Sequence, residues 1–234
     1  MKAGLIVLLI ALLAVPAWAQ KGGYQPKGKG VFSANGQEFR VVAPGDFCVT
    51  EGDVYAKAAR RVQSYATGMV VHSVLVDCKQ LKAFVDNGVQ FYAFGLIATP
   101  KEDAGKPYED ARRDYTRWFA EKYRITDDIR VQLPKPEDRI QQVAEDVKVN
   151  QTRRGGIIRQ NHDGVYFATL WGRNEDKRIV KYIGITGATM AKRTILHYML
   201  VTDYKNAKTI RNLEKQVVDG VDQLLTLNAN PLGG

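Results

Sequence analysis

The sequence contains three histidines, the side chains best suited to acid–base or metal chemistry near neutral pH. His72 and His197 lie in apolar runs, whereas His162 precedes Asp163 and Gly164 in a turn pattern. A hydrolytic or metal site would need a histidine near carboxylates or cysteines at a recognisable spacing. The chain has no H-E-x-x-H, G-x-S-x-G, P-loop or Rossmann glycine pattern. We therefore assign no catalytic residue, no metal ligand and no cofactor, and enzymatic activity stays open.

Basic side chains form the second group that could do chemistry. If the last four predicted strands make an antiparallel meander, alternate connections meet at the same end of the sheet. Gly155 and Gly156 would lie at that end, with backbone N–H groups free to face an anion. We therefore predict an anion-binding or partner-binding surface there; a solvated rim, diluted by Glu175 and Asp176, is the alternative. The predicted surface consists of Arg153, Arg154, Arg173, Arg178, Lys205 and Lys208.

The N-terminal segment, residues 1–19, has the pattern of a cleavable secretory signal. Lys2 is followed by an uncharged apolar run from Ala3 to Val15, and Ala17 and Ala19 fit the A-x-A rule for cleavage after Ala19. An uncleaved membrane anchor is the alternative, although the apolar stretch is at the short end of the spanning range. We expect a periplasmic or secreted protein with no membrane span after cleavage.

The two cysteines agree with this location. Cys48 and Cys78 are the only cysteines of the chain, and disulfides persist outside the cytoplasm. Their spacing is far from the C-x-x-C pattern of redox proteins. We therefore predict a structural Cys48–Cys78 disulfide.

The remaining chain is predicted to form a basic tail and one domain. Residues 20–30 are rich in glycine and lysine and have no apolar face, so we expect them to be flexible. Residues 31–230 are predicted to form a single α+β domain, an antiparallel sheet with helices packed on its faces. The predicted helices cover residues 53–65, 108–123, a segment beginning at Pro136, and 205–227. The predicted strands are a hairpin around Asn35-Gly36, then 69–76, 89–98, 157–161, 165–171, 179–186 and 194–204.

This order of elements resembles the Mog1/PsbP-like α/β/α sandwich. The resemblance rests on the segments YIGITG and TILHYMLVTDYKNAKTIRNLEKQVVDGVDQLL, which are similar to the last strand and helix of that family. It covers most of the domain in element order and carries no diagnostic motif. The resemblance implies an α/β/α sandwich that acts as a binding module, and it assigns no role to any residue.

Composition limits the classes of partner. The chain has a net charge of +9, of which Lys2 is the only contribution from the predicted signal. A basic protein can bind anionic lipids, anionic polymers, nucleic acids or acidic proteins, and export argues against nucleic acid. We expect a non-catalytic binding or accessory module of the cell envelope, with an anionic envelope component or a protein as partner. The alternatives are an exported hydrolase with a site assembled from scattered residues and a structural subunit of an envelope complex.

Overall fold

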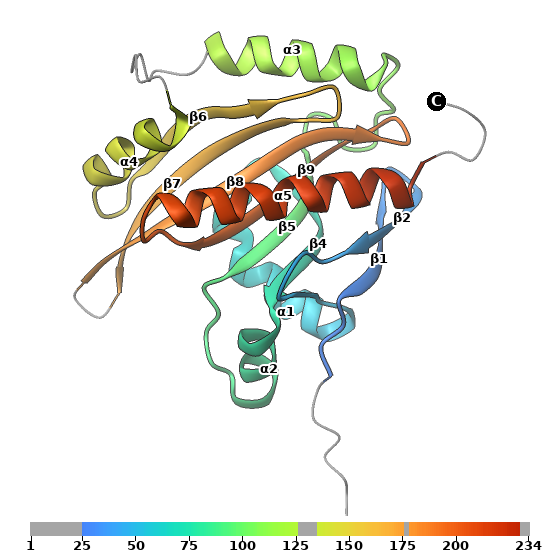
Figure 1. Ribbon diagram of the computed structural model, residues 1–234. Helices are drawn as coiled ribbons and strands as arrows, with labels where there is room; N and C mark the ends of the chain where they lie inside the picture. Colours follow the sequence, from blue (N-terminus) through green and yellow to red (C-terminus); the bar gives the residue numbers. More distant parts are fainter. Residues whose placement is uncertain (1–24, 126–134, 176–177, 230–234) are drawn as a thin grey trace, which may run out of the picture.

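A seven-stranded antiparallel sheet with the order β3-β4-β5-β9-β8-β7-β6 forms the centre of the molecule (Figure 1). The computed structural model describes residues 25–125, 135–175 and 178–229, so the predicted signal at residues 1–19 lies outside the described part. The strands are β3 Phe47–Val49, β4 Met69–Asp77, β5 Phe94–Pro100, β6 Thr152–Gln160, β7 Val165–Glu175, β8 Arg178–Ala191 and β9 Thr194–Asp203. Strands β6 to β9 are paired in sequence order, which confirms the predicted meander.

Helices cover both faces of this sheet, as predicted for an α/β/α sandwich. On one face, α4 (Pro136–Asp146), α5 (Ala207–Leu227) and the β1–β2 hairpin share one hydrophobic cluster with the strands. On the other face, α1 (Gly52–Val62) and α2 (Cys78–Asn87) cover β3 to β5, and α3 (Arg112–Ile125) packs on the meander. Figure 1 shows the long helix α5 running across the first face.

Helix α5 follows directly from its sequence pattern. Ile210, Leu213, Val217, Val221 and Leu224 are all buried, which places the apolar stripe on the sheet. Asn206 begins the helix, because its side chain accepts hydrogen bonds from the backbone N–H groups of residues 208 and 209. The prediction of a long amphipathic C-terminal helix is thus confirmed.

The N-terminal hairpin is formed by β1 (Lys29–Ala34) and β2 (Gln37–Val42). Asn35 and Gly36 both have positive φ, 49° and 72°, as the turn of a tight hairpin requires. The structured chain starts earlier than the predicted tail boundary at Gly30. The carbonyl oxygens of Lys27 and Gly28 accept hydrogen bonds from the N–H groups of Val49 and Ala43. Backbone pairing of this kind needs no apolar side chains, so the composition of residues 20–30 did not indicate this earlier start.

The predicted disulfide between Cys48 and Cys78 is present and joins β3 to the first residue of α2, with a Cα–Cα distance of 5.0 Å. Helix α2 was not predicted; a strand from residue 89 was, whereas β5 begins only at Phe94. The signals of α2 are local: Asp77 caps its start and Gly88 ends it with a φ of 69°. In the described part of the chain, no helix is both long and apolar enough to span a bilayer.

Candidate functional site: a basic cleft at one end of the sheet

The six predicted basic residues lie toward one end of the meander but face different surroundings. Arg173 donates to Ser64 Oγ at 3.1 Å, and its guanidinium lies 4.1 Å from the centre of the Tyr65 ring. Lys205 and Lys208 instead line a separate cleft at the start of α5. Arg153, Arg154 and Arg178 are exposed on the strands. The structure therefore places these cations near one sheet end without directing them into one cleft.

The Gly155-Gly156 pair has a structural role in β6. Arg139 of α4 donates to the carbonyl oxygens of Gly155 and Ile157 at 2.9 and 2.6 Å, so this strand offers acceptors to a cation. A Cβ at Gly155 would lie 2.9 Å from Ala168 Cβ, which shows how closely α4 and β7 approach the strand here. Gly156 has a φ of 79°, next to a shift in the β6–β7 register. Close packing and backbone geometry therefore account for both glycines.

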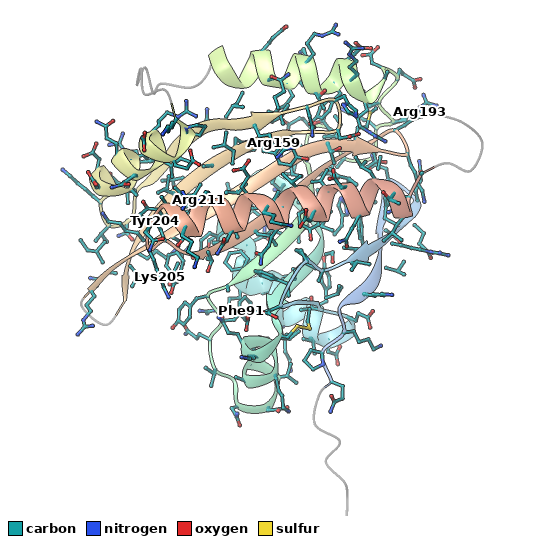
Figure 2. All side chains as sticks on the ribbon, in the orientation of Figure 1. Phe91, Arg159, Arg193, Tyr204, Lys205 and Arg211 are labelled. Carbon is teal, nitrogen blue, oxygen red and sulfur yellow. A yellow bond between two sulfur atoms is a disulfide. The ribbon has the colours of Figure 1, made fainter. Side chains whose placement is uncertain are left out.

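A larger basic cleft lies at the opposite end of the meander. It has a volume of about 1250 Å³ and lies between the start of α3, the β6–β7 turn and the β8–β9 turn. Figure 2 shows Arg193 and Lys205 at opposite ends of the sheet. The cationic residues that line this basic cleft are Arg112, Arg113, Arg117, Lys192 and Arg193.

Two turns build the floor of the basic cleft. In the β6–β7 turn, Asn161 Oδ1 accepts hydrogen bonds from the N–H groups of Asp163 and Gly164 at 3.0 and 2.8 Å. In the β8–β9 turn, Lys192 and Arg193 have φ values of 47° and 59°, where glycine or asparagine is preferred. Contacts from distant segments hold this second turn: Lys192 Nζ donates to the Glu38 carbonyl at 2.7 Å, and the Tyr108 N–H donates to the Arg193 carbonyl at 2.7 Å.

The cations of the basic cleft differ in how firmly they are held. Arg112 donates to the Met190 carbonyl at 2.7 Å and to Asp163 Oδ1 at 2.9 Å, which fixes its guanidinium. Arg193 pairs with Glu109, and Arg117 Nη1 lies 3.6 Å from Asp114 Oδ1. The side chain of Arg113 has no hydrogen-bond or ion-pair partner among the described residues. Five cations thus face three carboxylates, which leaves a surplus of positive charge.

The basic cleft also holds a histidine next to an acid, the pairing that a hydrolase would need. His162 Nε2 lies 3.0 Å from Asp163 Oδ2, but 77% of the His162 side chain is exposed and Asp163 already binds Arg112. The hydroxyl among the lining residues is that of Thr116, which is buried and donates to the Arg113 carbonyl at 2.9 Å. The histidine is therefore not aligned with a nucleophile in this arrangement. Within the described ranges, no three His, Cys, Asp or Glu side chains are grouped to hold a metal ion.

The cationic residues of the basic cleft were not predicted from the sequence, although two signals mark them. Arg113 and Arg117 are four residues apart and therefore share one face of α3. Lys192 and Arg193 occupy a two-residue hairpin turn in place of the usual asparagine and glycine. Neither signal by itself indicates that the two pairs meet. Comparisons with protein-family models, with curated proteins and with solved structures find no match for this chain.

Proposed function

We propose that this protein is an exported binding module of the cell envelope that binds a phosphate-bearing anion in the basic cleft. The observation that carries the proposal is that five cationic residues, from the start of α3 and the β8–β9 turn, line one open cleft. Arginine suits this ligand because its planar guanidinium can donate two parallel hydrogen bonds to phosphate oxygens. The element order, which resembles a sandwich family of binding modules, agrees with this role.

The electrostatics of the basic cleft favour exchange of its surface carboxylates for a ligand. The side chains of Glu109 and Asp114 are 74% and 56% exposed, so their ion pairs with arginine are weak. A phosphate group with several charges can replace them at little cost. The first residues of α3 line the same cleft, and the partial positive charge of a helix N-terminus adds to the attraction.

Charge reversal at matched places tests the proposal. The Arg113→Glu/Arg117→Glu variant changes two exposed residues of the cleft, and the Arg153→Glu/Arg178→Glu control makes the same change at the other end of the sheet. We expect calorimetric titration with tripolyphosphate at about 50 mM salt to show about tenfold weaker binding for the first variant, and a change of less than about twofold for the control.

The outcome that contradicts the proposal is equally clear. Equal loss in both variants, or no saturable binding by the unmodified protein, removes the basic cleft as the site. A larger loss in the control would support the surface that the sequence predicted. Vesicles containing phosphatidylglycerol, compared with phosphatidylcholine vesicles, distinguish a lipid headgroup from a free phosphate compound as the source of the anion.

A further inference from the structure

The sheet face that carries α1 and α3 is not fully covered by them. Beside the 3-10 turn η1 (Gln63–Tyr65), a groove of about 280 Å³ opens onto strands β4 to β9. We call it the threonine groove, because the hydroxyl-bearing residues Ser64, Thr67, Thr152, Thr169 and Thr186 line it together with aromatic side chains and methionines. None of its lining residues carries a full charge at neutral pH, in contrast to the basic cleft.

Rigid aromatic side chains form one wall of the threonine groove. Trp171 packs edge-on against Tyr65 with a centroid distance of 5.5 Å. The Arg173 guanidinium lies over the Tyr65 ring, 4.1 Å from its centre. A Cβ at Gly184 would lie only 2.6 Å from the Trp171 ring, so glycine lets the indole lie close against β8. The wall is therefore held in place without a ligand.

His197 supplies a polar group with an unmet hydrogen bond. Its ring lines the groove, packs edge-on against Phe119 and Phe167, and keeps Nε2 buried without a hydrogen-bond partner among the described residues. Burial lowers the pKa of His197 to about 4, so the imidazole is neutral at neutral pH. A neutral imidazole still has one nitrogen that accepts and one that donates. Thr186 lies on the same face, because Thr186 pairs with Met199 and Ala188 pairs with His197.

We propose that the threonine groove binds a small, uncharged aromatic compound that carries one hydroxyl group, which donates a hydrogen bond to the His197 imidazole. An uncharged lining disfavours ions, and the aromatic wall and methionines favour a flat ring. The volume fits a one- or two-ring molecule. His197 is only partly buried as a residue, and Nε2 is its covered nitrogen, so a hydroxyl group in the groove would donate to the other ring nitrogen, Nδ1, while Nε2 carries the ring proton. This site is separate from the basic cleft and does not depend on the function proposed for it.

The experiment uses three probes of one size. 2-Naphthol carries the hydroxyl, 2-methoxynaphthalene lacks its hydrogen, and 2-naphthoate carries a charge. We expect 2-naphthol to bind the purified protein saturably and to shift the ring nitrogen resonances of His197 in NMR spectra. Binding of the methoxy compound should be about five- to tenfold weaker, as expected for one lost hydrogen bond, and binding of the naphthoate weaker still.

Two variants locate the site. His197→Phe keeps the ring volume and should weaken 2-naphthol binding about five- to tenfold. Thr169→Leu, at a partly exposed residue, fills the groove and should abolish binding. The Arg113→Glu/Arg117→Glu variant of the basic cleft should bind 2-naphthol as the unmodified protein does. Thermal unfolding of each variant checks that it is folded. Absence of saturable 2-naphthol binding, or binding by His197→Phe equal to that of the unmodified protein, overturns the proposal.

Discussion

The imidazole of His197 lies between two phenylalanine rings, with centroid distances of 5.5 Å to Phe119 and 6.2 Å to Phe167. Burial lowers its pKa, and the negative charge of Glu102 opposes that effect. His162, by contrast, is largely exposed in its turn. The buried environment of His197 therefore sets its pKa apart from the ordinary value, and this difference can be measured.

The lowered pKa predicts that acid destabilises the protein through His197. The pKa is about 4 in the folded chain and about 6.5 in an unfolded one, so between these values only the unfolded state takes up the proton. Stability is therefore lost as pH falls from about 6.5 to about 4, by at most about 3–4 kcal/mol. Urea unfolding across this range should show a smaller loss for His197→Phe than for the unmodified protein.

The control for this measurement is Asn212→Ala, a change at an exposed residue that does not titrate, which should lose stability with acid as the unmodified protein does. His72 also has a pKa lowered by burial, so part of the acid effect should remain in His197→Phe. An identical pH dependence in His197→Phe and the unmodified protein would show that His197 takes up its proton equally in both states.

At the scale of elements, one side chain joins the C-terminal end of α5 to the N-terminal hairpin. Asn228 Oδ1 accepts from the Arg40 N–H at 2.9 Å, and its Nδ2 donates to the carbonyls of Arg40 and Leu224 at 2.8 and 2.7 Å. Asn228 is 4% exposed; its bond to Leu224 is buried, and its two bonds to Arg40 are partly buried. On the edge of β2 that no strand pairs with, the Asn228 amide takes the place of a strand partner and holds the hairpin against the end of α5.

Removing this amide is predicted to destabilise the fold. Asn228→Ala removes the partners of the N–H and C=O groups of Arg40, which are partly buried, at a cost of about 1–2 kcal/mol. Chemical denaturation measures the loss as a lower midpoint. Asn212→Ala, on the exposed side of α5, is the matched control and should change the free energy of unfolding by less than about 0.5 kcal/mol. Equal midpoints for the two variants would show that the hairpin is held by its apolar contacts alone.

For the whole molecule, two regions of the meander differ in charge. The basic cleft lies at the strand ends and carries a surplus of cations, whereas the lining of the threonine groove is uncharged. The net charge of +9 adds a general attraction for anions that salt screens. The two proposed ligands should therefore respond differently to ionic strength.

Salt dependence is the corresponding prediction. Raising the ionic strength from about 0.05 M to about 0.5 M shortens the range of electrostatic attraction roughly threefold, so tripolyphosphate binding should weaken by about tenfold or more. Binding of 2-naphthol should stay within about twofold, because its affinity comes from apolar contact and one neutral hydrogen bond. Parallel calorimetric titrations of both probes make the comparison. A loss of 2-naphthol binding with salt as large as that of tripolyphosphate would contradict an uncharged site.

Local signals in the sequence were sufficient for much of the architecture. The Asn35-Gly36 turn, the apolar stripe of α5 and the succession of short-turned strands each depend on residues close together in the chain. These signals predicted the hairpin, the long helix and the four-stranded meander. The number of cysteines and the export pattern predicted the disulfide, because only one intramolecular pairing of two cysteines exists. Helix α2 was missed because its ten residues are few for a periodic pattern.

Only the tertiary structure decided where the candidate sites lie, because each is assembled from segments that are distant in the sequence. Arg112 meets the Met190 carbonyl across 78 residues, and the amide of Asn228 reaches Arg40 across 188. From the sequence alone, the Gly155-Gly156 pair is compatible with an anion site. In the fold, Arg139 donates to the Gly155 carbonyl, a contact that the sequence does not indicate. The sequence determined most of the helices and strands, since periodicity and turn residues are local signals. Tertiary packing determined which helix and strand ends meet, and the basic cleft and the threonine groove lie where these segments come together.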